Sequence, residues 1–350
     1  MEKKRKRVVF YVLWRILLTI LATLLCLLAT AVGLVGVVLR GPSPSAASLF
    51  CRTVHETSAL RWIPDLFLSP EQLSALLAVE EETENSAAAP GVSLVHLDAR
   101  KTAETPAARA EEPELQLLDI ASGNCRGKLL IVRDPKRVIL GTIDPIGRGS
   151  GRLLTDLVET YDGVAGVNAS GFEDGMGLGN GGTPTGMVIR DGELVWGEAT
   201  SQYSVVGLDG DGLLIVGRMS AKEALDLGMR WGVSFITHDG VASSLIINGE
   251  IQTKNLTGGV NPRTAIGQRE DGALLLLVLD GRSITTLGAT LENVCDIMLS
   301  YGAVTVGNLD GGSSSLMVYD GEIVNTCSSI TGPRLIPTAF IVLKEDGHEN

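Results

Sequence analysis

The chain opens with a basic cluster at residues 3–7 and then runs from residue 16 to residue 39 without a charge. As a helix these 24 residues would be about 36 Å long, slightly more than the roughly 30 Å hydrocarbon layer of a membrane. A cleavable signal peptide is the alternative, with a normal apolar core of about 7–15 residues, and Ala46-Ala47-Ser48 would permit cleavage. The length favours an uncleaved single-pass transmembrane helix, with the basic end in the cytoplasm and everything after Arg40 outside.

The next stretch has a different texture. Gly41-Pro-Ser-Pro-Ser predicts a break, and Ser69-Pro70-Glu71-Gln72 predicts a helix start because proline suits the first helical position. From residue 80 to residue 114 the chain is rich in Ala, Glu, Thr and Pro with little apolar periodicity, which is typical of a loose spacer. We therefore divide the chain into a cytoplasmic tip with the transmembrane helix (1–40), a helical and low-complexity stalk (41–114) and a folded domain (115–346).

Beyond residue 115, short apolar runs alternate with turn signals, and helical patterns are few. Strands are predicted at 128–133, 137–141, 163–167, 212–216 and 272–279, and helices at 152–161, 221–227 and 289–301. This pattern predicts an α+β fold, a β-rich mixed-sheet single domain with inserted helices.

Most Asp-Gly and Asn-Gly pairs predict two-residue hairpin turns, because such turns need a positive φ at both central positions. Pairs of this kind, each flanked by apolar segments, are Asp191-Gly192, Asn248-Gly249, Asp271-Gly272 and Asp320-Gly321. Two pairs do not fit. Asp280-Gly281 ends a long apolar run and is followed by Arg282, and Asp310 ends another run before two glycines and three serines.

A carboxylate at a strand end beside glycines can face a ligand, because glycine lets backbone N–H groups approach closely. The segment from Gly311 to Ser314 adds hydroxyl donors, so it can bind an anionic oxygen of a ligand. The adjoining Asp310 carboxyl would then be available as an acid or a base. The chain has no Gly-x-Ser-x-Gly elbow and no His near these serines in sequence, which disfavours a Ser-His-Asp enzyme.

Two further residues lie at strand boundaries. Arg263 follows a proline at the entrance to a predicted strand, and arginine is the residue expected where a phosphate or carboxylate is clamped at two points; a rim salt bridge is the alternative. Asn168 leads from a strand into a glycine-rich loop, where its amide either reaches a substrate or caps a turn.

Charge and composition narrow the function classes. The chain has 29 Lys and Arg against 41 Asp and Glu, of which the first forty positions hold seven and one, so the rest carries 22 basic and 40 acidic groups. Nucleic acid is therefore excluded as a partner, since its binding surface would be basic. The scattered Cys and His residues match no zinc pattern; Cys51, Cys125, Cys295 and Cys327 permit disulfides or are buried as small hydrophobic residues.

Four stretches together resemble a known family: VNASGFEDGMGLGNGGTPTGMVIRDGELV, NPRTAIGQREDGALLLLVLDGR, LGATLENVCDIMLSYGAVTVGNLDGGSSSLMVYDGEIVN and IPTAFIV. Their order is similar to that of the phosphodiester glycosidase family, the uncovering-enzyme-like domain, and most similar to its membrane-anchored bacterial branch labelled exopolysaccharide biosynthesis proteins. The resemblance covers about residues 128–342.

The resemblance implies hydrolysis of a sugar-1-phosphodiester, with Arg263 holding the phosphate and with Asp280 and Asp310 at the reacting centre. Residues expected to bind substrate are Asn168, Gly171, Thr264, Arg282, Asn308, Gly311, Gly312, Ser313 and Ser314. Asp280, Asp310 and Asn308 could also form an oxygen-only site suited to Ca²⁺ or Mg²⁺, and a metal-free pocket is equally compatible.

Two departures from the family pattern leave a second hypothesis open. The chain has Asn168-Ala169-Ser170-Gly171 where the family usually has Asn-Gly-Gly, and His238-Asp239-Gly240 indicates an altered loop. The first hypothesis is an extracytoplasmic hydrolase in the cell membrane, acting on phosphodiester-linked glycans of cell-surface glycopolymers or exopolysaccharide. The second is a non-catalytic carbohydrate-binding or assembly factor in surface polysaccharide biosynthesis. The catalytic hypothesis requires that Arg263, Asp280 and Asp310 meet around one pocket.

Overall fold

The computed structural model describes residues 2–55, 60–77, 91–92, 113–175, 179–235, 243–252, 259–281, 283, 286–329 and 331–345. Most of the predicted spacer, together with Arg282 and the predicted altered loop at His238-Asp239-Gly240, lies outside these residues.

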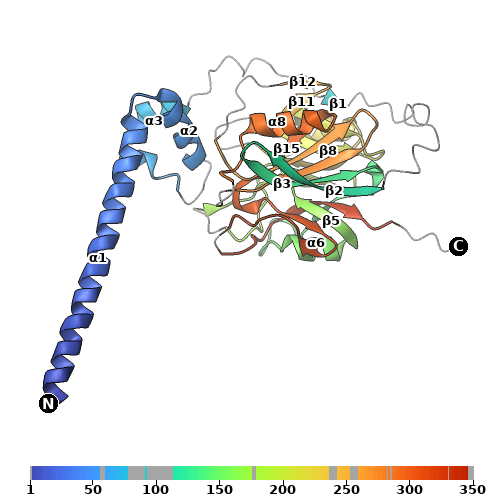
Figure 1. The fold of residues 1–350 in the computed structure, drawn as a ribbon. Helices are drawn as coiled ribbons and strands as arrows, with labels where there is room; N and C mark the ends of the chain where they lie inside the picture. Colours follow the sequence, from blue (N-terminus) through green and yellow to red (C-terminus); the bar gives the residue numbers. More distant parts are fainter. Residues whose placement is uncertain are drawn as a thin grey trace.

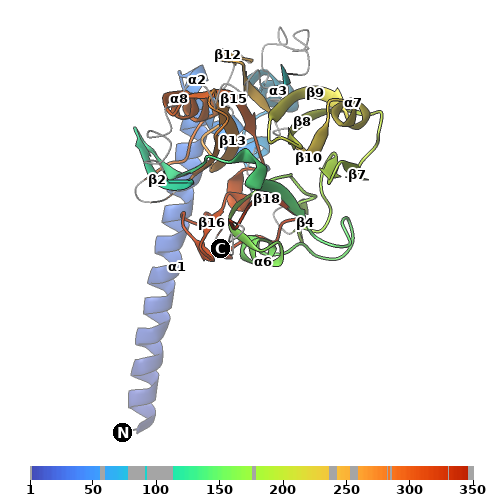
Figure 2. The same cartoon turned by 90° about the vertical axis from the view of Figure 1, so that its right-hand side faces the viewer.

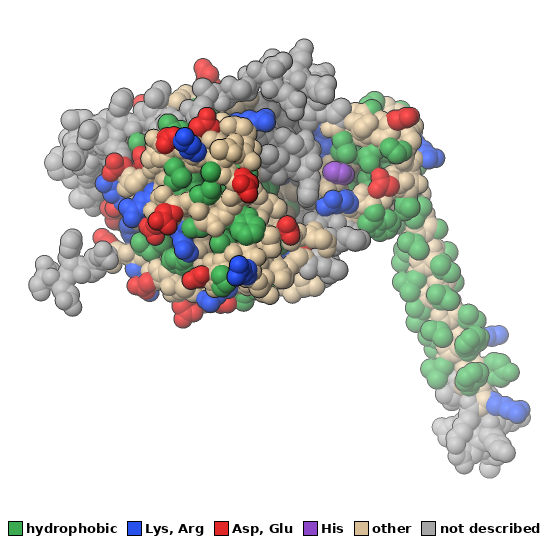
Figure 3. All heavy atoms as spheres, turned by 180° about the vertical axis from the view of Figure 1, so that it is seen from behind, with side chains coloured by type: hydrophobic (Ala, Val, Ile, Leu, Met, Phe, Trp, Pro, Cys, Tyr) green, Lys and Arg blue, Asp and Glu red, His purple; other side chains and the backbone are tan. Residues whose placement is uncertain are grey.

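The N-terminal region is a long helix, α1 (Glu2–Arg40), that projects away from the rest of the chain (Figure 1). Within its Phe10–Arg40 stretch, an 18-residue window has a mean hydropathy of 2.5, and none of that window is buried against protein. Figure 3 shows hydrophobic side chains covering much of its length. By length and composition this helix can cross a membrane, a test that a signal sequence also passes.

A small helical unit follows at the far end of α1. It consists of α2 (Pro44–His55), the 3₁₀ helix η1 (Pro64–Leu66) and α3 (Pro70–Leu77). The predicted start of α3 is confirmed: the Ser69 hydroxyl accepts the Gln72 N–H at 3.2 Å, and the Gln72 side chain accepts the Ser69 N–H at 3.0 Å. These bonds satisfy donors that a helix start leaves free.

The remaining chain forms three sheets in which every pairing between described strands is antiparallel. The six-stranded sheet has the order β1 (Gly91–Val92), β9 (Leu214–Ser220), β8 (Gln202–Asp209), β10 (Met229–Ser234), β6 (Val188–Arg190) and β7 (Glu193–Trp196). The seven-stranded sheet has the order β12 (Glu250–Ile251), β11 (Ser244–Ile247), β15 (Ala303–Asn308), β13 (Arg263–Arg269), β14 (Leu274–Leu279), β3 (Cys125–Val132) and β2 (Leu115–Ser122). The five-stranded sheet has the order β17 (Glu322–Ile323), β16 (Met317–Tyr319), β5 (Gly163–Asn168), β18 (Thr338–Leu343) and β4 (Val138–Thr142).

The three sheets share one central core and carry a helix each on their outer faces. The central cluster joins Leu276 of the seven-stranded sheet to Val206 of the six-stranded sheet and Phe340 of the five-stranded sheet. On the outside, α8 (Leu291–Ser300), α6 (Leu154–Thr160) and α7 (Ala221–Asp226) cover the seven-, five- and six-stranded sheets, and Figure 2 shows them on different sides of the strands. Strands such as β14 are therefore buried on both faces, which explains their unbroken apolar sequences.

The predicted α+β class and the β-rich domain with inserted helices are confirmed. All three helices lie within their predicted ranges. Three hairpin turns have the predicted positive φ at both central positions: Asp191-Gly192, Asn248-Gly249 and Asp320-Gly321.

The predicted two-residue turn at Asp271-Gly272 is wrong, because the loop there is longer. β13 ends at Arg269 and β14 begins at Leu274, so the two strands are joined by four residues instead of two. The Asp271 side chain accepts the Ala273 N–H at 3.2 Å and pairs with the Arg269 guanidinium at 2.7 Å, which stabilises the longer loop. All five cysteines lie in the described residues and are free, and three of them are buried.

Candidate functional site

Three strand ends meet at one edge of the seven-stranded sheet. β13 pairs with β14 on one side and with β15 on the other, with Arg263 opposite Leu279 and Ala265 opposite Asn308. Because both pairs are antiparallel, the start of β13 lies beside the ends of β14 and β15. The main-chain positions of Arg263, Asp280 and Asp310 are therefore brought together, while a pocket shared by their side chains stays a prediction.

Asp310 lies where this edge meets the five-stranded sheet. Its N–H donates to the Ala169 carbonyl at 3.0 Å, and its carbonyl accepts the Asn168 side-chain amide at 2.5 Å. Gly312 ties the next turn to β13, because its N–H donates to the Pro262 carbonyl at 3.0 Å. Asp310 is thus held by main-chain and side-chain contacts from both sheets.

The environment of the Asp310 carboxyl raises its pKa to about 7. Burial is the main cause, and the nearby Asp174 carboxylate also raises the pKa. Hydrogen bonds from the Ser314 hydroxyl and the Gly311 N–H lower it, as does the charge of Arg334. A carboxyl with this pKa can accept or release a proton near neutral pH, the property expected of a general acid or base.

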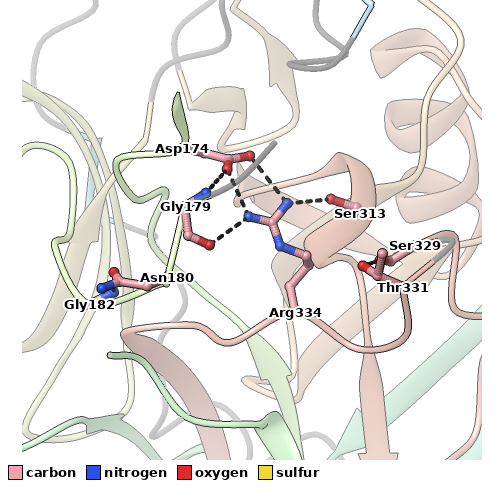
Figure 4. Close-up of polar contacts among 8 residues, drawn as sticks. All are labelled: Asp174, Gly179, Asn180, Gly182, Ser313, Ser329, Thr331 and Arg334. Atoms are coloured by element: carbon pink, nitrogen blue, oxygen red, sulfur yellow. Dashed lines mark hydrogen bonds and ion pairs between the residues drawn. The ribbon is translucent and has the colours of Figure 1, made fainter. Parts of the chain in front are cut away.

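Beside Asp310 lies a buried ion pair between Arg334 and Asp174, drawn in Figure 4. The Arg334 guanidinium donates to both Asp174 carboxylate oxygens, at 2.8 and 3.2 Å, and to the Ser313 hydroxyl at 3.2 Å. It also donates to the Gly179 carbonyl at 3.2 Å and lies over the Phe172 ring, 5.2 Å from its centre. With 11 % of the Arg334 side chain exposed and 18 % of the Asp174 side chain exposed, both groups are largely withdrawn from solvent.

Arg334 and Asp174 were not among the residues predicted from the sequence. One signal was present: Pro333-Arg334 shortly precedes strand β18, as Pro262-Arg263 precedes the rest of β13. Asp174 lies in the glycine-rich loop after β5, and the sequence does not distinguish it from the other polar residues of that loop as a site residue. The two residues are 160 positions apart, and no periodicity connects them.

Arg263 reaches the site with its backbone, while its side chain is buried. Nε donates to the Ala289 carbonyl at 3.1 Å and Nη2 donates to the Gly259 carbonyl at 2.9 Å. In this arrangement the guanidinium fixes two neighbouring loops. The cation that acts on the Asp310 charge is Arg334.

Asp280 is held on the other side of the strand junction. Its Oδ1 accepts the Thr326 N–H at 2.9 Å and the Asn325 side-chain amide at 3.4 Å. The adjoining Gly281 N–H donates to the Ser328 hydroxyl at 3.1 Å. The segment after β17 therefore fixes the orientation of this carboxylate.

Asn168 and Thr264 organise the site from within. Both are buried, and the Asn168 Oδ1 accepts the Thr264 hydroxyl at 2.9 Å and the Leu316 N–H at 3.1 Å. Together with its bond to the Asp310 carbonyl, these contacts occupy the Asn168 amide inside the protein. These bonds hold the strand ends in place, and a substrate contact by either residue stays a prediction.

The other predicted binding residues divide by exposure. Gly311, Gly312 and Ser313 are partly exposed, whereas Gly171, Asn308 and Ser314 are buried. The Asn308 amide is distinctive, because neither its nitrogen nor its oxygen has a hydrogen-bond partner among the described residues. A buried amide without partners is unfavourable unless something else satisfies it.

The residues that depart from the family pattern fit the loop. Ala169 is fully buried, and its carbonyl accepts the Asp310 N–H. The Ser170 N–H donates to the Thr338 hydroxyl at 2.9 Å, which in turn donates to the Ser170 hydroxyl at 2.7 Å. The two added side chains are accommodated with their polar atoms bonded.

Among the residues that the structure describes, no group of three or more His, Cys, Asp or Glu side chains could hold a metal ion. The oxygen-only set suggested by the sequence has two carboxylates and the Asn308 amide, so Ca²⁺ or Mg²⁺ binding there stays a prediction.

Comparison with known proteins places this chain in a family. The protein is 26 % identical over 220 residues to the uncharacterized SPbeta prophage-derived protein YomE of Bacillus subtilis, covering 59 % of this chain and 32 % of YomE. It is 30 % identical over 156 residues to bovine N-acetylglucosamine-1-phosphodiester alpha-N-acetylglucosaminidase, covering 40 % of this chain and 29 % of that enzyme. The matched segments thus span about a third of the length of these relatives.

The fold is shared with a solved structure, the zebrafish N-acetylglucosamine-1-phosphodiester alpha-N-acetylglucosaminidase catalytic domain auto-inhibited by its pro-peptide. That likeness has a TM-score of 0.53 at 21 % identity and covers 77 % of this chain and 100 % of that chain. Residues 161–343 match the family model described as phosphodiester glycosidase. Since this match covers more than half of the chain, the protein belongs to the phosphodiester glycosidase family, as its sequence motifs predict.

Proposed function

We propose that the protein is a hydrolase that cleaves sugar-1-phosphodiesters. Water adds to the anomeric carbon, the bond between that carbon and the phosphate oxygen breaks, and the products are a free sugar and a phosphomonoester. Family membership supports this reaction, and the bovine relative is named for a glycosidase acting on such a linkage.

The observation that carries the proposal is the Asp310 carboxyl, with its pKa raised to about 7 at the junction of two sheets. A phosphate is a good leaving group, so the reaction needs little proton donation to it. It needs an activated water and negative charge near the sugar ring, whose carbon becomes positive in the transition state. We assign Asp310 as the base that takes the proton from water, and Asp280 as the second carboxylate at the reacting centre.

We assign Arg334 to the phosphate of the substrate. A guanidinium binds two phosphate oxygens in the same fork geometry that Asp174 uses here, and the Ser313 hydroxyl adjoins it. A local cation is needed because the chain as a whole carries a net charge of −12. Arg263, which the resemblance assigns to the phosphate, is the competing residue, and its buried side chain would have to leave two carbonyls to reach a ligand.

We propose that α1 is an uncleaved anchor and that the domain faces the outside of the cell. The basic N-terminus supports this orientation by the positive-inside rule, since five of the first seven residues are Lys or Arg. The substrate would then be a phosphodiester-linked glycan of a cell-surface glycopolymer or exopolysaccharide. Protection of the domain from protease in spheroplasts, with cleavage only after lysis, would overturn this orientation.

The competing proposal is a carbohydrate-binding or assembly factor without turnover. It rests on two departures from the family pattern: Ala169 and Ser170, which the loop accommodates with bonded polar atoms, and His238-Asp239-Gly240, which lies outside the described residues. The bonded loop gives no support to a loss of turnover at the first of these two positions.

The test is incubation of the purified full-length chain with the methyl phosphodiester of N-acetylglucosamine-1-phosphate. We expect free reducing sugar and methyl phosphate in equal amounts, and loss of about 10²- to 10⁴-fold in rate for Asp310→Asn. Sugar binding without release by the wild type would support the non-catalytic factor. Comparing Arg334→Gln with Arg263→Gln assigns the phosphate: the variant of the phosphate-binding residue raises KM for this substrate without weakening binding of the free sugar.

A further inference from the structure

The segment between α2 and α3 exposes large apolar side chains. Trp62 is 48 % exposed, Leu66 is 68 % exposed and Leu60 is 38 % exposed. Transfer of the exposed parts of these side chains from water into an apolar environment would be favourable.

Phe67, near the C-terminal end of this segment, lies against the last turns of α1. A Cβ atom on Gly36 would be 3.5 Å from the Phe67 ring, so the ring rests on the helix at that glycine. The Arg40 guanidinium donates to the Phe67 carbonyl with Nε at 3.1 Å and Nη2 at 2.6 Å. The chain therefore turns back after α1 ends and returns to the level of Gly36–Arg40.

The length of α1 places that level at a membrane surface. At the opposite end, Phe10, Tyr11 and Trp14 are exposed and directly precede Arg15, the last charged residue before Arg40. The 21 steps from Arg15 to Gly36 give a helix rise of about 32 Å, which matches the roughly 30 Å hydrocarbon layer. Tryptophan and tyrosine are enriched at both membrane–water interfaces.

We propose that the segment of residues 60–68 is a second membrane contact, in which Trp62 and Leu66 insert into the headgroup region of the leaflet on the domain side. The partner is a phospholipid bilayer, and the two aromatic levels, Phe10 to Trp14 and Trp62 with Phe67, mark its two surfaces. The proposal rests on α1 being a membrane anchor and is independent of the hydrolytic reaction. Two contacts instead of one would fix the height of the catalytic domain above the bilayer.

Lipid quenching of tryptophan fluorescence tests this contact in the intact protein. The full-length chain is reconstituted into phosphatidylcholine vesicles, and its emission is compared with that in vesicles of phosphatidylcholine brominated near the headgroup. The chain has four tryptophans: Trp14, Trp62, Trp196 and Trp231. We expect brominated lipid to quench the emission of Trp14 and Trp62, so Trp62→Phe removes about half of the quenched emission.

Two matched variants make the result decisive. Trp14→Phe, at the anchor, is expected to remove the other half, and Trp196→Phe, in the folded domain, is expected to remove none. Unchanged quenching by brominated lipid in Trp62→Phe overturns the proposal. Quenching of Trp62 by iodide would then show that this side chain faces water, and resistance to iodide would show that a second copy of the chain shields it. If Trp14→Phe also leaves the quenching unchanged, α1 does not cross the bilayer and its assignment as a membrane anchor is wrong. The proposed hydrolytic function is tested separately by the hydrolysis assay and does not depend on this result.

Discussion

Asp310→Asn should slow hydrolysis by about 10²- to 10⁴-fold and, at neutral and alkaline pH, stabilise the fold. The pKa of the folded-state carboxyl is about 7 against an ordinary value of 3.8, chiefly because of burial. Between these values the folded protein keeps a proton that the unfolded chain has lost. Stability therefore falls as pH rises from about 4 to about 7, and above pH 7 the full penalty of the buried charge is present.

The size of this effect follows from the interval between the two values. About three pH units at 1.36 kcal/mol each correspond to about 4 kcal/mol as an upper bound. Since Asp310 is only partly buried, solvent screening reduces the expected gain for Asp310→Asn to about 2 to 3 kcal/mol at pH 8. Near pH 4 the wild-type carboxyl is neutral in the folded state, so the difference should nearly vanish.

The assay is urea unfolding of the full-length protein in mild detergent, followed by tryptophan fluorescence at pH 8 and pH 4.5. Asp320→Asn is the matched control, because Asp320 is exposed in a hairpin turn with a φ of 50°, a conformation that asparagine tolerates. The control should follow the wild type at both pH values. An Asp310→Asn variant less stable than wild type at pH 8, or equally shifted at both pH values, would refute the assigned environment of this carboxyl.

Three further changes have expected outcomes. Arg334→Gln removes a charge that lowers the pKa of Asp310, so the pH midpoint of kcat/KM should move upward, and Arg334→Lys should restore it. An unmoved midpoint in the glutamine variant would contradict the electrostatic effect of Arg334 on Asp310. Asn168→Ala leaves buried partners unsatisfied and should lower the free energy of unfolding by about 2 to 4 kcal/mol in urea titrations, and a loss below 1 kcal/mol would contradict its positioning role. Hydrolysis should survive exhaustive EDTA treatment, because the described residues bring together no group of three or more His, Cys, Asp or Glu side chains that could hold a metal ion; activity lost and then restored by Ca²⁺ or Mg²⁺ would establish a metal site.

The periodic parts of the fold could be predicted from the sequence, because each element carries its own signal. The unbroken apolar run of β14 and the positive-φ turn at Asp320 are local properties of a few residues. The Asp271 turn failed because a side chain that pairs with Arg269 stabilised a longer loop, and a dipeptide pattern contains no such contact.

The site was predictable only as far as strand ends mark it. Asp280 and Asp310 stood out because glycines follow each at the end of an apolar run, but the strand order that joins them is a long-range property. Burial was also hidden: Arg263 was expected to face a ligand, and its guanidinium is bonded to carbonyls. The pair of Arg334 and Asp174 exists only because two distant loops meet.

The central claim is that this site breaks the bond between the sugar carbon and oxygen, and the position of an isotope tests it most directly. The wild-type protein hydrolyses the methyl phosphodiester of N-acetylglucosamine-1-phosphate in water enriched in oxygen-18, and the earliest products are analysed by mass spectrometry. A glycosidase using Asp310 to activate water places the label on the anomeric carbon of the released sugar and none in methyl phosphate. Label found in the phosphate would mean attack at phosphorus and would contradict the assignment of this site.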